Sequence, residues 1–309
     1  RAEIGGPPGR MSTMGVFSRS FALFKASWGV LRHDKELLAL PVISAVTSFL
    51  CVAPFVGLIA VTALDSATRG VATSGSLDGL SIGPLGYVLM FVAYLIGAYV
   101  TIFFQSALVL AANERLSGGE PTLGWAISAA ASNAGRILPW AIISATVSIV
   151  LQAVQERAGF IGRIVVGLVG MAWTLVTFLV LPILVIEQVG VKDALSRSAS
   201  AFKRTWGENV VGNGGIGLVM MLVGLLAFVL TAPVAFVGAS TGNTPLLVLG
   251  VILVVVAMVA VSVLGAALSG VFRTALYRYA VLGEEPTGFT HDQIASAFRP
   301  KRTRGASAI

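Results

Sequence analysis

Long apolar runs separated by short polar segments dominate the pattern along the chain. The longest stretch without a single Asp, Glu, Lys, Arg or His covers 64 residues, from Asn209 to Phe272. A helix needs about 20 apolar residues to cross the hydrocarbon core of a bilayer. The stretch therefore predicts two membrane crossings, joined by a polar turn over residues 238–245.

The whole chain contains six apolar runs that are long enough to span a membrane. Because lipid offers no partner to the backbone N–H and C=O groups, a spanning segment must satisfy them itself, as a helix does. We therefore expect an all-α polytopic membrane protein. Its passes are predicted at residues 41–64, 83–112, 137–155, 164–186, 210–237 and 246–272.

The positions of Lys and Arg predict the orientation of these passes. Of the 21 basic residues, 18 flank the passes on one side, and only Arg69, Arg157 and Arg163 lie on the other. Basic connecting segments stay on the cytoplasmic side of a membrane. We therefore expect a plasma (inner) membrane protein with both termini in the cytoplasm, as an even number of passes also requires.

Composition agrees with this class of protein. Hydrophobic residues make up 56% of the chain and charged residues 11%, against about 25% charged residues in a soluble domain. We expect a disordered tail over residues 1–14, one membrane domain over 15–298 and a basic tail over 299–309. The single cysteine, Cys51, excludes an intrachain disulfide and a multi-cysteine metal site.

The net charge of +7 bears on the partners. The basic residues are spread over short segments next to the passes, where they meet the anionic head groups of the inner leaflet. A nucleic-acid-binding protein would need a folded basic surface. We therefore expect membrane lipids as partners, with a membrane-protein partner as a further candidate and no nucleic acid.

Two short sequence matches predict internal repeats. Gly118-Gly119-Glu120-Pro121-Thr122 follows the second pass, and Gly283-Glu284-Glu285-Pro286-Thr287 follows the sixth, 165 residues later. Ser200-Ala201-Phe202-Lys203 is echoed by Ser296-Ala297-Phe298-Arg299. We expect three repeats, over about 15–115, 120–189 and 190–285, each with a cytoplasmic interfacial amphipathic helix before a pair of passes.

The interfacial helices are predicted from aromatic stripes at helical spacing. In the first repeat the anchors are Phe17, Phe21, Phe24 and Trp28; in the last repeat they are Phe202 and Trp206. Lys192, Arg197, Lys203 and Arg204 are then available to phosphate head groups. Each stripe either anchors the bundle at its depth or forms a docking surface for a partner. The middle segment, 122–136, carries a weaker stripe.

Ionisable residues at the ends of the even-numbered passes form the candidate functional site. A charge at the membrane margin usually finds a partner, and we expect Glu187 to pair with Arg273. An alternative role for these residues is a path for a substrate or ion. Gln105 and Gln152 are the main polar interruptions within the passes. The candidate polar network consists of Glu114, Arg115, Glu187, Gln188, Arg273 and Arg278.

Catalytic motifs find little support in the sequence. The two histidines, His33 and His291, are far apart, and no zinc helix, nucleophile elbow or phosphate loop is present. The glycines of 212–217 match the G-x-G-x-x-G spacing, but that motif requires a preceding strand. We interpret them as packing residues, with a cradle for a lipid phosphate as the alternative. No catalytic residue, cofactor or metal is expected.

The opening of the chain resembles a known family. It reads S-W-x-V-L-x-x-D-K-E-L from Ser27 to Leu37, followed by Leu40-Pro41. These residues resemble a prokaryotic family of six-pass membrane proteins of unknown function, over about 16–298. More distantly, a helix before each pair of passes is similar to the membrane domain of some glycerophosphodiester phosphodiesterases. The resemblance implies a topology and supplies no catalytic residues.

Three functions remain open at this point. We expect a non-enzymatic accessory or scaffold subunit of a membrane complex or lipid process. The alternative is a small permease for lipid or an apolar solute, moving cargo between repeats. A membrane-embedded enzyme acting on lipid head groups would require Asp34, Glu114 and Glu187 to meet in one pocket.

Overall fold

The computed structural model describes residues 27–29, 35–74, 83–206 and 215–284. All regular structure in these residues is helical, and six helices are long and apolar enough to cross a membrane. The all-α prediction, with six helices that could cross a membrane, is therefore confirmed. The six candidate spans are Leu37–Leu64, Pro84–Leu116, Ala134–Arg157, Phe160–Ile186, Val219–Ser240 and Thr244–Leu282.

The helices follow one another with short connections. Their bounds are α2 Lys35–Ser74, α3 Pro84–Leu116, α4 Leu123–Ser132, α5 Ala134–Arg157, α6 Phe160–Val176, α7 Val180–Ile186, α8 Val191–Trp206, α9 Gly215–Ser240 and α10 Thr244–Tyr277, continued by a π-helical turn over Arg278–Leu282. Residues 27–29 form a single helical turn.

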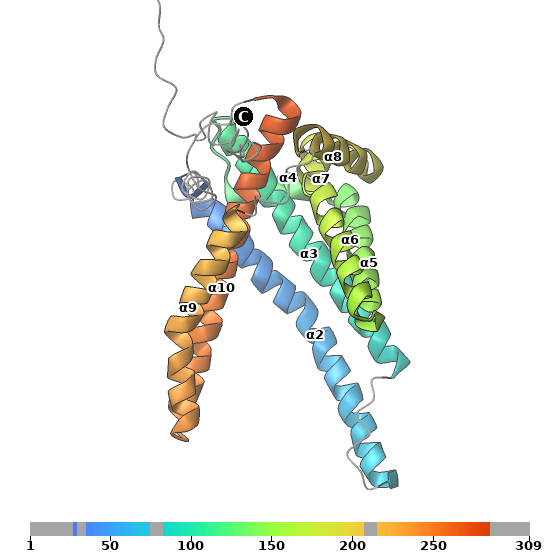
Figure 1. The fold of residues 1–309 in the computed structure, drawn as a ribbon, viewed down its shortest axis with the longest axis vertical. Coiled ribbons are helices and arrows are strands. Elements are labelled where there is room, and N and C mark those ends of the chain that lie inside the picture. Colours follow the sequence, from blue (N-terminus) through green and yellow to red (C-terminus); the bar gives the residue numbers. More distant parts are fainter. Residues whose placement is uncertain (1–26, 30–34, 75–82, 207–214, 285–309) are drawn as a thin grey trace, which may run out of the picture.

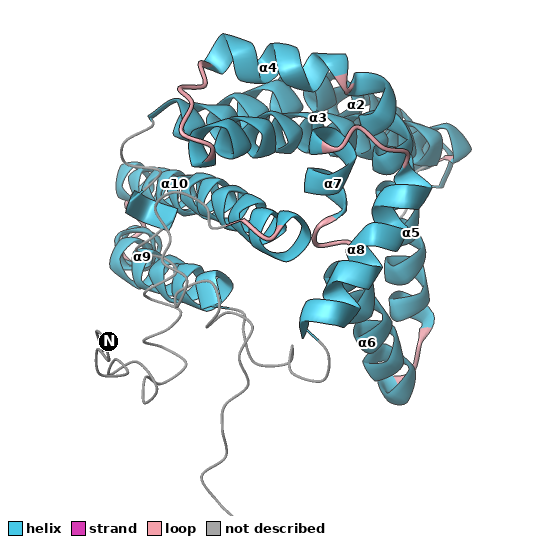
Figure 2. Ribbon diagram, turned by 90° about the horizontal axis from the view of Figure 1, so that it is seen from above, coloured by secondary structure: helices cyan, strands magenta, loops and turns pink. Residues whose placement is uncertain are grey.

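The long helices converge at one end of the molecule and diverge at the other (Figure 1). The two shorter helices α4 and α8 lie across the converging end, transverse to the spans, as Figures 1 and 2 show together. We call this end the packed end, and the opposite end, with the α5–α6 and α9–α10 turns, the open end. At the open end the α9–α10 hairpin stands apart from α2, α3, α5 and α6 (Figure 1).

Helix α3 is central to the packed end. It contacts α2, α4, α5, α7 and α10. Its last four turns bury small and branched side chains, among them Ala107, Leu108 and Ala112. Small residues let helix axes approach closely in a membrane, where dispersion contacts replace the hydrophobic effect as the source of association. Gly270 of α10 shows this, because a Cβ at that position would lie 2.4 Å from the Leu108 Cδ2 atom.

The open end has the reverse character. Large apolar side chains such as Phe160 and Phe236 are exposed there. A soluble protein rarely exposes so much apolar surface. The same surface is stable in contact with lipid tails, which are as apolar as the side chains themselves.

The α9–α10 hairpin remains tightly packed although it reaches the open end. A Cβ on Gly250 would lie 2.2 Å from the backbone N of Ala235, so the two helix backbones are nearly in contact. The turn between them uses Gly242 with φ 66°, and the Asn243 side chain caps α10 by accepting from the Leu246 N–H at 3.1 Å. The predicted polar turn within 238–245 is thus present.

The fourth pass is broken, which the sequence pattern did not predict. It consists of α6 and α7, with an irregular segment over residues 177–179. Pro182 explains the break, because a proline lacks the N–H that would bond to the carbonyl of Phe178 and its ring crowds that carbonyl. Ser198 of α8 partly repairs it: its hydroxyl donates to the Val176 carbonyl at 2.5 Å and accepts from the Leu179 N–H at 3.3 Å.

Three helices at the packed end are each followed by a residue in the left-handed backbone conformation. Gly118 follows α3 with φ 89°, Gln188 follows α7 with φ 55°, and Gly283 follows the π-helical turn with φ 71°. A left-handed residue just after a helix turns the chain back and satisfies the last carbonyls. Gln188 is the one non-glycine residue with positive φ in the described part of the chain.

The transverse helices also bury matching positions. Along α4 and the residue after it, the buried positions are Ala126, Ala130 and Asn133; along α8 they are Ala194, Ser198 and Ala201. Both sets have the spacing i, i+4, i+7, which places small side chains on one helix face. This buried face of α8 lies beside the predicted aromatic stripe, in which Phe202 is half-buried.

Candidate functional site

A polar cluster lies where α3, α7 and α10 end. These three helix ends carry the residues that the sequence pattern singled out at the even-numbered passes. Two sets of contacts make up the cluster, one around Glu187 and one around Arg278. Because Tyr277 and Arg278 are consecutive, the two sets are directly connected through the chain.

Glu187 is held by residues from two other helices. Its Oε2 atom forms an ion pair with Arg197 of α8, and its Oε1 atom accepts from the Tyr277 hydroxyl of α10 at 3.1 Å. The Glu187 side chain is only 17% exposed, whereas that of Arg197 is 55% exposed. The expected pair of Glu187 with Arg273 is not formed among the described residues. Helix α8 folds back over α7 and places Arg197, rather than Arg273, beside the carboxylate.

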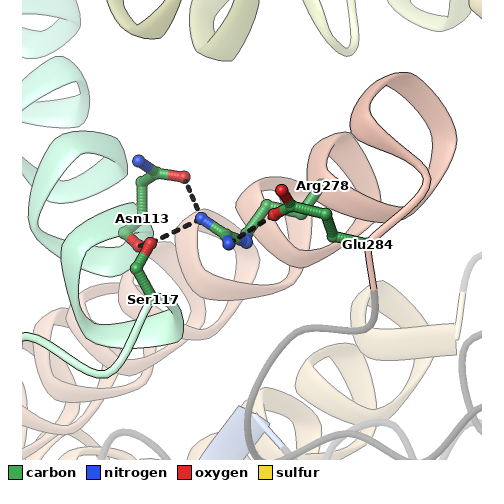
Figure 3. A network of polar contacts seen from close by, with 4 residues as sticks. All are labelled: Asn113, Ser117, Arg278 and Glu284. Atoms are coloured by element: carbon green, nitrogen blue, oxygen red, sulfur yellow. Dashed lines mark hydrogen bonds and ion pairs between the residues drawn. The ribbon is translucent and has the colours of Figure 1, made fainter.

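Arg278 binds α3 to the end of the last helix (Figure 3). Its Nη1 atom donates to the Asn113 Oδ1 atom at 3.0 Å and to the Ser117 hydroxyl at 2.6 Å, and its Nη2 atom lies 2.5 Å from Glu284 Oε2. The planar guanidinium suits such multiple contacts because its donors point in fixed directions. The arginine side chain is 13% exposed and that of Glu284 is 52% exposed, so water screens their ion pair in part.

Arg273 occupies a different environment, one turn before Tyr277 on α10. Its guanidinium carbon lies 5.0 Å from the centre of the Phe178 ring, in the break of the fourth pass. A cation over an aromatic face is attracted by the ring quadrupole. The Nε atom of Arg273 is buried and has no hydrogen-bond partner among the described residues. The residue therefore belongs to the same end of the molecule without joining the Glu187 contacts.

Glu114 and Arg115 stabilise their own loop. The Arg115 Nη1 atom donates to the Gly119 carbonyl at 3.3 Å and lies 4.0 Å from Glu120 Oε1. The Glu114 side chain lies against Gly119, where a Cβ would be 2.4 Å from its Oε1 atom. Gln188 is exposed and follows α7 with positive φ. Of the six residues predicted as one network, the structure thus places Glu187 and Arg278 in the cluster.

The predicted anchors are described only in part. Phe17, Phe21 and Phe24 lie outside the described residues, as does Asp34, one of the three acidic residues considered for an enzyme. Trp28 is 38% exposed and Phe202 is half-buried. Trp206 ends α8, and its side chain lies outside the described part. Anchoring by these residues stays a prediction.

Sequence reasoning did not single out Tyr277, Ser117, Ser198 or Phe178. Arg197 pairs with Glu187, and its predicted contact with head groups stays a prediction. One sequence signal for the Arg278 contacts exists: Asn113 and Arg278 are separated by 165 residues, the offset of the repeated motif. The predicted repeats would make these two residues equivalent, although the offset alone predicts no contact between them.

The polar residues inside the passes lie apart from the cluster. Gln105 is exposed on α3. Gln152 is exposed on α5, where its amide lies 3.4 Å from Glu156. Within the described part of the chain, no group of three or more His, Cys, Asp or Glu side chains is placed to hold a metal ion.

Comparison with known proteins identifies a family whose function is unknown. The model of a family of unknown function, DUF6159, matches residues 84–289. The opening residues 27–41, which carry the resemblance noted from the sequence, lie before the matched range. No curated protein and no solved structure matches the chain. Since the matched range covers more than half of the 309 residues, this chain belongs to the family of unknown function DUF6159.

Proposed function

We propose that this protein is a non-enzymatic scaffold or accessory subunit of a membrane complex or lipid process, and that its packed end is the contact surface. The proposal is based on the charged side chains at that end, which bind other side chains of the same chain. Glu187 pairs with Arg197 and accepts a hydrogen bond from Tyr277. Arg278 donates to Asn113 of α3 and pairs with Glu284. Charged groups used in this way hold helices in one arrangement, which suits a rigid platform for a partner.

The proposal includes three repeats, each with a transverse helix in the membrane interface. Two structural features support it. Left-handed residues follow α3, α7 and the last helix, and α4 and α8 bury small residues at the same spacing. Equivalent packing at equivalent places is what duplicated units with one common fold would retain.

The exposed face of α8 suits an anionic membrane surface. Lys192 and Lys203 are exposed on it, and each basic residue near an anionic leaflet contributes about 1 kcal/mol of attraction. We infer that the packed end faces the cytoplasm, that both termini lie on that side, and that the protein resides in the plasma (inner) membrane.

Cysteine labelling tests this orientation. In a Cys51→Ala background, Glu120→Cys and Lys192→Cys report on the two connections at the packed end, and Thr241→Cys reports on the α9–α10 turn. We expect an impermeant maleimide added to intact cells to label Thr241→Cys and to leave the other two unlabelled until the cells are opened. Labelling of Glu120→Cys and Lys192→Cys from opposite sides contradicts the repeat architecture.

Co-purification tests the scaffold role. The full chain is extracted in mild detergent and its partners are quantified by mass spectrometry, with and without charge reversal at Lys192 and Lys203. The matched control is Arg163→Glu, a reversal at the open end. A stoichiometric partner that is lost with the α8 reversals and kept in the control supports the proposal. A chain that purifies alone in every case contradicts it.

A permease is the second candidate, and the broken fourth pass favours it. Internally repeated transporters build their sites at discontinuous helices near the middle of the membrane. The break over residues 177–179 lies within the span Phe160–Ile186. Reconstitution with a fluorescent phospholipid tests the idea: movement between leaflets faster than in protein-free vesicles supports a permease, and an equal rate rejects it.

A further inference from the structure

Among the residues that the structure describes, no carboxylate pairs with the charge of Arg273. The residue lies inside the span Thr244–Leu282, one turn before Tyr277. One helical turn corresponds to a rise of about 5 Å, so its Cα lies deeper in the span than the Glu187 contacts. Its guanidinium lies beside the Phe178 ring, and its buried Nε atom, like that of Arg278, has no hydrogen-bond acceptor in the described part of the chain.

The two carboxylates of the polar cluster are already engaged. Glu187 accepts from Arg197 and Tyr277, and Glu284 from Arg278. A guanidinium keeps its proton even when it is buried. An unpaired charge at membrane depth is costly and needs an anion or a hydrogen-bond acceptor to offset the lost hydration. Within the described residues, the structure supplies neither to the Arg273 Nε atom.

The geometry indicates which kind of anion fits. A ring near the guanidinium attracts its charge but accepts no hydrogen bond from its edge, where the buried Nε donor has no acceptor among the described residues. That edge binds the paired oxygens of a phosphate or carboxylate. Toward the open end, α6 exposes Leu168 and Met171, and α10 exposes Val255 and Val259. A ligand with a phosphate at Arg273 and acyl chains along these helices satisfies both surfaces.

We propose that Arg273 and Phe178 form a binding site for the phosphate group of a membrane phospholipid, with the acyl chains of that lipid lying along α6 and α10. The site goes beyond the scaffold role and does not depend on it. It is distinct from the surface attraction of α8, since it holds one lipid at one guanidinium. It gives the buried charge of Arg273 its missing acceptor.

Native mass spectrometry of the full chain in detergent tests the site. The probes are phosphatidylglycerol, phosphatidylcholine and diacylglycerol with the same acyl chains. We expect the protein to retain both phospholipids and to lose diacylglycerol, which has no phosphate. Arg273→Gln removes the charged donors and should lower phospholipid retention about tenfold, the effect of one or more lost hydrogen bonds to a charged group. Arg273→Lys, with a single ammonium, should be intermediate.

Matched controls separate this site from general attraction. Lys203→Gln removes one charge from the same end, and Arg163→Gln repeats the substitution at the open end; both should retain the phospholipids. Phe178→Leu keeps the charge and removes the ring, and we expect weaker retention in a variant that elutes as the folded protein. These variants keep the test informative if Arg273→Gln does not fold.

Several outcomes would overturn the proposal. Equal loss with Lys203→Gln would show general surface electrostatics, and retention of diacylglycerol would show binding through acyl chains alone. Unchanged retention with both Arg273→Gln and Phe178→Leu would remove the site. Displacement of the phospholipids by inorganic phosphate would assign the site to a soluble anion. Lipid retention is measured without any protein partner, so failure here leaves the scaffold proposal standing.

Discussion

The packed end and the open end share the long apolar helices, yet they are stabilised differently. At the packed end, α3, α7 and α10 bury their apolar faces and are joined by the contacts of Glu187 and Arg278. At the open end the apolar side chains face outward, and the α9–α10 hairpin stands apart (Figure 1). The difference shows that apolar character places a helix in lipid, whereas close packing and polar contacts place it against another helix.

The largest expected effect is the loss of Arg278. Arg278→Ala leaves Asn113 and Ser117 without their donor and Glu284 without its cation. We expect the free energy of unfolding to fall by about 2 to 3 kcal/mol. The measurement is unfolding of the purified protein in detergent, with Arg163→Ala at the open end as the control. An equal loss in both variants would erase the contrast between the two ends.

Matched leucines sharpen the comparison. Leu184 of α7 is 0% exposed, whereas Leu230 of α9 is 68% exposed. Because both remain among apolar groups after unfolding in lipid, the transfer contribution is small and the cost is the lost packing. We expect Leu184→Ala to lose about 2 kcal/mol and Leu230→Ala almost nothing. A similar loss at Leu230 in vesicle unfolding experiments would mean that this part of α9 is covered by protein.

The α9–α10 hairpin is an exception to the difference between the two ends, because its helices are tightly packed at the open end. A Cβ on Gly250 would meet backbone atoms of Ala235, which side-chain rotation cannot relieve. We expect Gly250→Ala to lose about 1 to 2 kcal/mol by forcing the helices apart. Gly217→Ala is the control, since a Cβ there has no atom within 4 Å among the described residues. Thermal unfolding of both variants is the measurement.

The smallest expected effect concerns the break in the fourth pass. Ser198→Ala removes the hydroxyl that bonds to the Val176 carbonyl and the Leu179 N–H. We expect a loss of about 1 kcal/mol and faster hydrogen exchange at Leu179. Ser196→Ala, on the exposed face of α8, should leave both unchanged. Unaltered exchange in Ser198→Ala would show that the break is stabilised by other contacts.

Much of the fold could be predicted from the sequence, and less of the site. Glu187 was correctly placed at the end of the fourth pass, because a hydrophobic run has a readable end. The predicted partner of Glu187, Arg273, was wrong. Helix α8 folds back over α7 and brings Arg197 to Glu187 instead. This arrangement depends on the packing of Ala194 and Ala201 rather than on any charge pattern. The position of Pro182 does not by itself predict the break, since prolines in spans are often accommodated when another group satisfies the backbone.

The sequence by itself determined which segments lie in lipid and which lie in water. A run of apolar residues must enter lipid whatever its neighbours are, so the passes were readable one at a time. The tertiary structure alone decided which charges meet, which face of α8 is buried, and that Arg273 is left beside Phe178 without an acceptor for its Nε. These features depend on distances between helices far apart in the chain, and lipid-facing and protein-facing positions are equally apolar in sequence.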